Sequence, residues 1–281
     1  MIRSILLPVA DGADWVTARE YAFWLARESR SRIHALALID VKSYEMPVLG
    51  TADGFMPSVV APPLDESRAL LDELTTAARE RIADFERECS TRGHSVSTDI
   101  KTGIPGEIVC REAVAHDIVV MSRGGYDRVS TEQRIDPLVQ SVIRGSTRPV
   151  LVAGQRFREI GHVLVAYDGS VHAARSLTVA VELGARPGVR TTLVNIAQSE
   201  DIGQETLAQA EGFLYHHGLS PQKKVVIGTK PSDLICDLVG ATGADLLVMG
   251  AYGHRAIREM LFGSTTERVL NHCGSSVVLS S

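Results

Sequence analysis

Short apolar runs alternate with longer amphipathic stretches along the 281-residue chain. The short runs are rich in Val, Ile and Leu, which is typical of strands buried on both faces of a parallel sheet. The longer stretches have the period of about 3.6 residues expected for helices that cover such a sheet. The alternation predicts βαβ units and therefore an α/β fold.

The predicted elements follow the same order twice. In the first half we expect strands near 3–9, 32–39, 96–101, 117–121 and 149–153, and helices near 13–29, 65–91, 105–115 and 135–145. In the second half we expect strands near 161–167, 189–196, 223–227, 245–249 and 276–280, and helices near 171–184, 203–217, 231–242 and 264–272.

The residues themselves also repeat. The segment ILLPVADG at 5–12 reappears as VLVAYDGS at 163–170, and DIVVMSRGG at 117–125 matches DLLVMGAYG at 245–253 without a gap. A fixed internal repeat of this length indicates duplication of a whole structural unit. We therefore predict two tandem domains, 1–154 and 158–281.

The two copies differ most at residues 41–64, which have no counterpart in the second half. This insertion contains the Pro- and Gly-rich segments Met46-Pro47, Gly54-Phe55-Met56-Pro57 and Ala61-Pro62-Pro63. These closely spaced prolines and glycines predict an irregular loop, and a loop of this length is usually either functional or mobile. We favour a mobile or packing loop over a recognition loop.

The composition argues against a disordered, nucleic-acid-binding, membrane-spanning or zinc-binding protein. Hydrophobic residues make up 44% and charged residues 22%, as in a folded protein, and the net charge of -5 offers no broad positive field to nucleic acid. No apolar run is long enough to span a membrane, and the first residues lack a cleavage region, so we expect a cytoplasmic protein. The four cysteines lack the CxxC spacing of a zinc site, which suits separate thiols in a reducing compartment and no structural metal.

The sharpest motif follows the buried strand that ends at Met249. Its spacing is G-x-x-G-x9-G-S, formed by Gly250, Gly253, Gly263 and Ser264. A glycine at the carboxyl end of a parallel strand allows a ligand to approach closely, and Ser264 or Thr265 is a natural cap for the helix that follows. Free N–H groups at the start of that helix would face an anion, so phosphate is the candidate ligand.

A purely structural interpretation of these residues is also open. Glycines at strand ends and Ser or Thr caps turn the chain in many proteins without binding anything. Asp168, at the carboxyl end of the first strand of the same copy, could accept hydrogen bonds from a nucleoside, but taken without the glycines it is better explained as an Asp-Gly turn or a cap of the next helix. The case for a ligand is that both features lie at one edge of the predicted sheet.

The duplication, Asp168 and the glycine motif together resemble a tandem universal stress protein with an ATP-binding second domain. The resemblance implies, for each domain, an open five-stranded parallel sheet of the Rossmann-like, adenine nucleotide alpha-hydrolase-like kind. It also implies ATP, with Mg2+ or Mn2+ on its phosphates, and a role in the stress response. By position it places Ala166, Asp168, Ile196, Met249 and Gly250 at the nucleoside, and Gly253, Gly263, Ser264 and Thr265 around the phosphates. Ala166 stands where the family often has proline.

The first copy lacks the phosphate end of this motif. It has Ser122 in place of Gly250, keeps Gly125, and has Ile135 and Asp136 in place of Gly263 and Ser264. An added carboxylate about 4 Å from a phosphate charge costs around 4 kcal/mol at an effective dielectric near 20. We therefore expect Asp136 to repel a triphosphate.

Other charged residues of the first copy have simpler interpretations. Arg123, Arg128 and Arg134 could offset the charge of Asp136, but solvated surface charges are the favoured interpretation. For Asp11, a turn or cap is favoured over a ligand site of its own.

No catalytic motif accompanies the glycines. The chain has neither a G-x-x-x-x-G-K-[ST] phosphate loop nor a G-x-S-x-G nucleophile elbow, so the sequence favours binding over catalysis. The leading hypothesis is an ATP-dependent regulator or sensor with an unidentified protein partner. The alternatives are a scaffold or small-ligand adaptor and a slow ATPase.

The last strand of each copy also bears on assembly. The apolar final runs at 149–152 and 276–279 would be unpaired edges in isolated domains. We expect them to face each other in an intramolecular pseudo-dimer, and a homodimer of such chains remains open.

Overall fold

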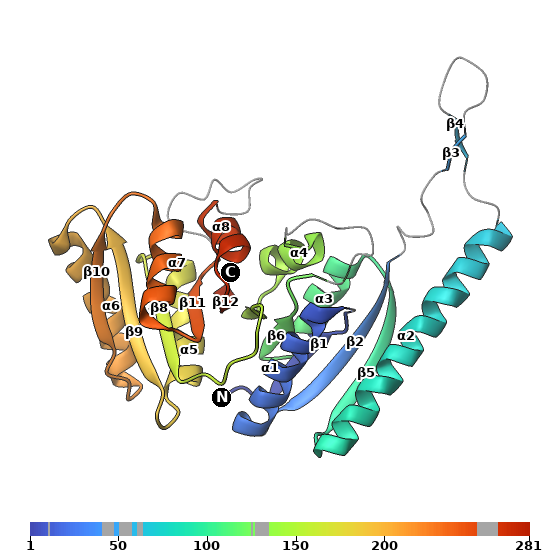
Figure 1. The fold of residues 1–281 in the computed structure, drawn as a ribbon, viewed down its shortest axis with the longest axis horizontal. Coiled ribbons are helices and arrows are strands. Elements are labelled where there is room, and N and C mark those ends of the chain that lie inside the picture. The colour runs from blue at the N-terminus through green and yellow to red at the C-terminus, as the bar shows by residue number, and fades with distance from the viewer. Residues whose placement is uncertain are drawn as a thin grey trace.

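A computed structural model of the chain describes residues 1–10, 12–40, 48–50, 58–60, 64–124, 126, 135–251 and 264–281. Within these residues one ten-stranded sheet runs through both halves of the molecule (Figure 1). Its strand order is β10-β9-β8-β11-β12-β7-β6-β1-β2-β5. Each domain therefore contributes one continuous half of the sheet.

The first domain begins with β1 and ends with β7. Its strands in this sheet are β1 (Ser4–Pro8), β2 (Arg32–Asp40), β5 (Val96–Gly103), β6 (Ile118–Met121) and β7 (Val150–Val152). Its helices are α1 (Ala13–Ser29), α2 (Leu64–Arg92), α3 (Pro105–Ala113) and α4 (Pro137–Gly145).

The second domain repeats this order. Its strands are β8 (His162–Ala166), β9 (Arg190–Ala197), β10 (Gln222–Ile227), β11 (Leu246–Gly250) and β12 (Ser276–Ser280). Its helices are α5 (Val171–Gly184), α6 (Glu200–His216), α7 (Pro231–Thr242) and α8 (Ser264–His272). The predicted α/β class, the parallel strands within each domain and the order of the elements are confirmed.

The two halves of the sheet meet at their last strands. Neighbouring strands are parallel within each domain, whereas β7 and β12 pair antiparallel, with Leu151 opposite Val278. The sheet is thus mixed, because the parallel halves run in opposite directions. This pair covers the two apolar edges that isolated domains would leave open.

The strand order fixes where a ligand could bind. In the second domain the chain builds β9 and β10 on one side of β8, then crosses to β11 and β12 on the other side. The point between β8 and β11 is a topological switch point, and open α/β sheets bind ligands at the carboxyl ends of the strands there. The corresponding point in the first domain lies between β1 and β6.

Helices cover both faces of the sheet. One buried cluster contains side chains of α1, α2, α5 and α6, and the other contains side chains of α3, α4, α7 and α8. The central strands between them are almost wholly buried, which is why they have no polar face in the sequence, whereas the outermost strands β5 and β10 are partly exposed and carry polar residues. None of the helices that the structure describes is long and apolar enough to cross a membrane.

Three sequence expectations about the fold need correction. Helix α6 begins at Glu200, three residues before the predicted start, with the acidic residues Glu200 and Asp201 in its first turn, where the helix dipole favours them. The 41–64 insertion contains a pair of antiparallel strands, β3 (Val48–Gly50) and β4 (Ser58–Val60), where an irregular loop was expected. In Figure 1 this pair stands apart from the main sheet.

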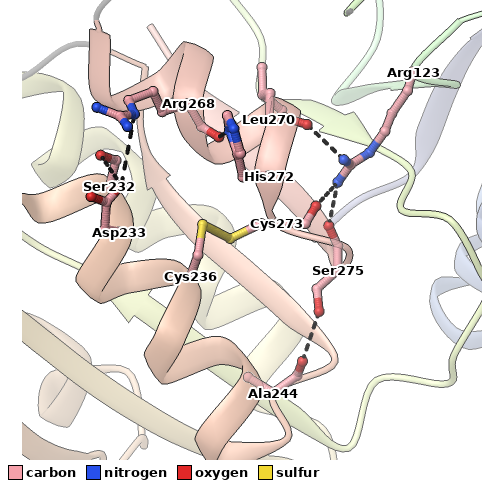
Figure 2. The surroundings of a disulfide bond; sticks show 10 residues. All are labelled: Arg123, Ser232, Asp233, Cys236, Ala244, Arg268, Leu270, His272, Cys273 and Ser275. Carbon is pink, nitrogen blue, oxygen red and sulfur yellow. Dashed lines mark hydrogen bonds and ion pairs between the residues drawn. A yellow bond between two sulfur atoms is a disulfide. The ribbon is translucent and has the colours of Figure 1, made fainter. Parts of the chain in front are cut away.

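The third correction concerns the cysteines. Cys236 in α7 and Cys273, which follows α8, form a disulfide, with their Cα atoms 5.2 Å apart. Figure 2 shows the bond between the two helices. The expectation of four separate thiols is therefore wrong for this pair, and only Cys89 and Cys110 are free.

Candidate functional site

The switch point of the second domain brings together the residues predicted at the nucleoside. Ala166, at the end of β8, pairs with Met249 of β11 on one side and with Val194 of β9 on the other. Ala166 and Ile196 are partly buried and pack against the cluster on the α7 and α8 face of the sheet, to which buried Met249 belongs. The three side chains therefore form an apolar surface on one face, at the carboxyl ends of adjacent strands.

Asp168 lies two residues beyond β8 and is exposed. Its Oδ1 accepts a hydrogen bond from the N–H of Ser170 at 3.0 Å, across Gly169 with φ of 80°. Ser170, not Asp168, is the N-cap of α5, because its side chain accepts from the N–H of Ala173. The predicted Asp-Gly turn is therefore present, and it leaves the carboxylate at the switch point.

Gly250 has a packing role that the motif did not predict. A Cβ built at this position would lie 2.6 Å from the backbone N of Ala173 and 2.7 Å from the carbonyl carbon of His172. A real Cβ cannot approach backbone that closely, so the close approach that requires glycine here is that of α5. The placement of Gly250 beside a nucleoside stays a prediction.

The helix predicted to face the phosphates is present as α8. Ser264, which is exposed, and Thr265, which is partly exposed, are its first two residues. The hydroxyl of buried Thr266 donates to the carbonyl of Ala251 at 2.6 Å, which fixes the start of α8 to the end of β11. Thr266 was not singled out from the sequence, although a third hydroxyl residue in the first turn was a usable signal. Gly253, Gly263 and the neighbouring His254 and Arg255 lie outside the described residues.

Tyr126 fills the corresponding switch point of the first domain. Its hydroxyl accepts from the N–H of Ser122, at the end of β6, at 3.0 Å and donates to the carbonyl of Pro8, at the end of β1, at 3.5 Å. Burial raises the pKa of Tyr126, so the phenol stays protonated and can make both bonds. Its side chain packs against the same cluster as Leu38 of β2.

Asp136 occupies the start of α4, the helix equivalent to α8. Its side chain is only 2% exposed. One carboxylate oxygen accepts from the N–H of Leu138 at 2.8 Å and the other from the N–H of Tyr126 at 3.2 Å. The first domain thus places its own carboxylate at the helix N-terminus that would otherwise face an external anion.

Arg123 does not have the solvated position expected from the sequence. Figure 2 shows its guanidinium reaching from the first domain to the end of α8 in the second. It donates to the carbonyls of Leu270 at 2.6 Å, Cys273 at 2.5 Å and Ser275 at 2.8 Å, and its Nε donates to Ala153 at 3.2 Å. Arg123 therefore caps α8, because a cation suits the negative end of the helix dipole. Arg128 and Arg134 lie outside the described residues.

Comparisons with known proteins agree with the duplication. A model described as the universal stress protein family matches residues 1–154 and again 159–280. The universal stress protein Slr1230 of Synechocystis is 26% identical over 284 residues, covering 96% of each chain.

Two solved structures share the whole fold. A universal stress protein from Archaeoglobus fulgidus superimposes with a TM-score of 0.75 at 18% identity, covering 99% of this chain and 96% of that one. A putative universal stress protein from Pseudomonas aeruginosa has a TM-score of 0.64 at 19% identity, covering 99% and 93%. With the family model matching both halves, the chain belongs to the universal stress protein family, in its tandem, two-domain form.

Proposed function

We propose that the second domain binds ATP, with Mg2+ or Mn2+ on the phosphates, and that the protein acts as a nucleotide-dependent regulator of a stress response. The observation that carries the proposal is the contrast between the two switch points. The first domain fills its own switch point with a tyrosine and a carboxylate. The second presents an apolar surface, an exposed carboxylate and an exposed helix start.

The nucleoside end of the second site suits adenosine. Partly buried Ala166 and Ile196 offer an apolar surface to a flat base. The exposed carboxylate of Asp168 can accept hydrogen bonds from ribose hydroxyls, since an ionised carboxylate is an acceptor only. In the first domain Pro8 is the equivalent of Ala166, since Pro8 pairs with Leu36 as Ala166 pairs with Val194. Tyr126 covers this equivalent surface, and its hydroxyl donates to the carbonyl of Pro8.

The phosphate end is formed by the start of α8. The first N–H groups of a helix have no partner within the helix and favour an anion. Ser264 and Thr265 add hydroxyl donors there, and Thr266 holds the helix at the strand end. A divalent ion on the phosphates would neutralise part of their charge.

The proposal is tested by moving the carboxylate of the first domain into the second. Ser264→Asp places an acid at the residue aligned with Asp136. We expect calorimetry with ATP and magnesium to show an affinity loss of about 100- to 1,000-fold, from one charge repulsion at an effective dielectric near 20. Adenosine, which lacks phosphates, should bind the variant and the parent within about threefold.

Ser264→Asn is the matched control, because it has nearly the same shape as the aspartate variant without the charge. It should keep ATP affinity within about fivefold of the parent. Absence of ATP binding by the parent protein would overturn the proposal. An equal loss for ATP and adenosine in the aspartate variant would show that the phosphates are not bound at α8.

A further inference from the structure

The disulfide joins the two helices that cover the proposed site on one face. Cys236 lies within α7, and Cys273 directly follows α8. The segment between the two cysteines contains the whole glycine motif and the start of α8. The bond therefore closes a loop of chain around the residues that we assign to the nucleotide.

The two cysteines of the disulfide differ in their exposure to solvent. Cys273 is buried, with 3% of its surface exposed, whereas Cys236 is partly exposed. A thiolate from outside would meet Cys236 first, and disulfide exchange depends on such access. The arrangement allows the bond to be opened in the folded protein.

The hydrogen bonds after α8 run both to the first domain and to Ala244, which follows α7 and whose carbonyl accepts from the hydroxyl of Ser275 at 3.3 Å. Arg123 binds the carbonyls of Leu270, Cys273 and Ser275. Towards α7 the structure gives Arg268 and Asp233, whose charged atoms lie 3.8 Å apart and whose side chains are exposed. An exposed ion pair of this kind is weak. Apolar side chains of α7 and α8 pack in one buried cluster, and the disulfide adds a covalent link to this packing.

A change in the orientation of the last turn of α8 also moves its first turn, because the helix is short. Its nine residues span about 13 Å at 1.5 Å per residue. Ser264 and Thr265 lie at one end and the disulfide at the other. Fixing the last turn against α7 therefore restricts the orientation of the first turn, where the phosphates would bind.

We propose that Cys236–Cys273 is a reversible redox modification site that sets the nucleotide affinity of the second domain. The inference rests on the proposed function, since it assigns regulation to that same site. The disulfide form holds α8 in the binding orientation. The dithiol form lets the start of α8 move relative to Ala166 and Asp168, which weakens ATP binding.

The redox step is an exchange with a dithiol reductant. One thiolate of the reductant attacks Sγ of Cys236, forming a mixed disulfide, and Cys273 leaves as a thiolate that takes up a proton. The second thiol of the reductant, as a thiolate, then attacks the reductant sulfur that is bonded to Cys236. Cys236 leaves as a thiolate and is protonated in turn. Two electrons and two protons pass to the protein, and the reductant becomes a cyclic disulfide.

Thiol counting is the first measurement. Alkylation after denaturation should find two thiols, Cys89 and Cys110, in the air-oxidised protein, and four after treatment of the folded protein with dithiothreitol. Four thiols before reduction, or resistance of the bond in the folded protein, would overturn the inference.

Calorimetry then compares the two forms. ATP with magnesium should bind the dithiol form about 5- to 50-fold more weakly than the disulfide form, a usual range for coupled sites. Cys236→Ser should reproduce the dithiol form without reductant, and its circular dichroism should match that of the parent. Cys110→Ser is the control, since Cys110 is unpaired and lies in the first domain, and it should leave the affinity unchanged.

Linkage supplies an independent readout. If the disulfide raises ATP affinity, ATP must make the disulfide harder to reduce by the same factor. The ratio of reduced to oxidised dithiothreitol at half-reduction should therefore rise 5- to 50-fold in saturating ATP. Equal ATP affinity in both forms would contradict this inference and leave the proposed function intact, whereas no ATP binding in either form would contradict both.

Discussion

Arg123 shows how one residue of the first domain supports the second. It is aligned with Ala251, yet its guanidinium serves four carbonyls, three of them in or just after α8. Burial lowers the pKa of Arg123, with Asp14 as the opposing influence, but an arginine remains charged. The planar array of donors suits this cluster of acceptors, and a lysine could not satisfy all four.

We predict that Arg123→Lys lowers the free energy of unfolding by about 2–4 kcal/mol, because partly buried carbonyls lose charge-assisted hydrogen bonds. Urea denaturation monitored by circular dichroism measures this loss. Arg111→Lys, at a side chain that is 67% exposed, is the control and should change stability by less than about 0.5 kcal/mol. A loss below about 1 kcal/mol for the Arg123 variant would show that the four bonds add little.

At the residue scale the sequence predicts the interactions of a side chain only where its partners are close to it along the chain. The Asp-Gly turn at Asp168 and the helix start at Ser264 could be predicted, because their partners lie within a few residues. The partners of Arg123 lie up to 152 positions away, and the two cysteines of the disulfide are 37 residues apart. No local spacing indicates which distant backbone or thiol the fold brings to such residues.

At the scale of elements, α6 contains two glycines that the fold treats differently. A Cβ at Gly203 would lie 2.3 Å from a methyl group of Val225 in β10, whereas nothing lies within 4 Å of a Cβ at Gly212. Valine is stiff at its first side-chain torsion and cannot swing aside easily. The first glycine is thus required by close packing of helix on strand.

The same substitution at these two positions should therefore have opposite effects. Gly212→Ala should stabilise the protein by about 0.5–1 kcal/mol, because alanine favours the helix. Gly203→Ala should destabilise it by about 1–3 kcal/mol, because the methyl group overpacks the contact with Val225. Urea denaturation of both variants measures these changes in the free energy of unfolding. Stabilisation by both substitutions would mean that α6 is not packed closely on β10.

Most elements could be predicted, because a buried parallel strand is a continuous apolar run and a covering helix has a clear period. The pair β3 and β4 was missed, since short strands among prolines and glycines lack that pattern. Apart from this pair and Leu64, which begins α2, the 41–64 insertion lies outside the described residues, so its role stays a prediction.

At the scale of the whole molecule, partly or fully buried histidines make stability depend on pH. Burial lowers the pKa of His34, His116 and His162; the charge of His34 lowers that of His116 further, and Arg190 that of His162. The folded state therefore favours the neutral rings. The unfolded chain, with histidine pKa values near 6.5, binds more protons as the pH falls.

Since the unfolded state binds more protons, the free energy of unfolding should decrease as the pH is lowered from 8 to 5. The stabilisation is complete above the unfolded pKa near 6.5 and is lost as the pH falls from there towards the lowered folded values. Urea melts at several pH values measure the slope. His162→Gln should reduce it, because burial and Arg190 lower the pKa of that histidine. A stability that is constant or rises towards pH 5 would contradict this account.

The continuous sheet also gives the molecule two opposed switch points, of which only the second is proposed to bind. The most direct test is a crystal structure of the protein grown with ATP and magnesium. The account predicts adenine at Ala166 and Ile196, phosphates at the start of α8, and Tyr126 and Asp136 still in place in the first domain. Nucleotide density between β1 and β6, with none between β8 and β11, would contradict it.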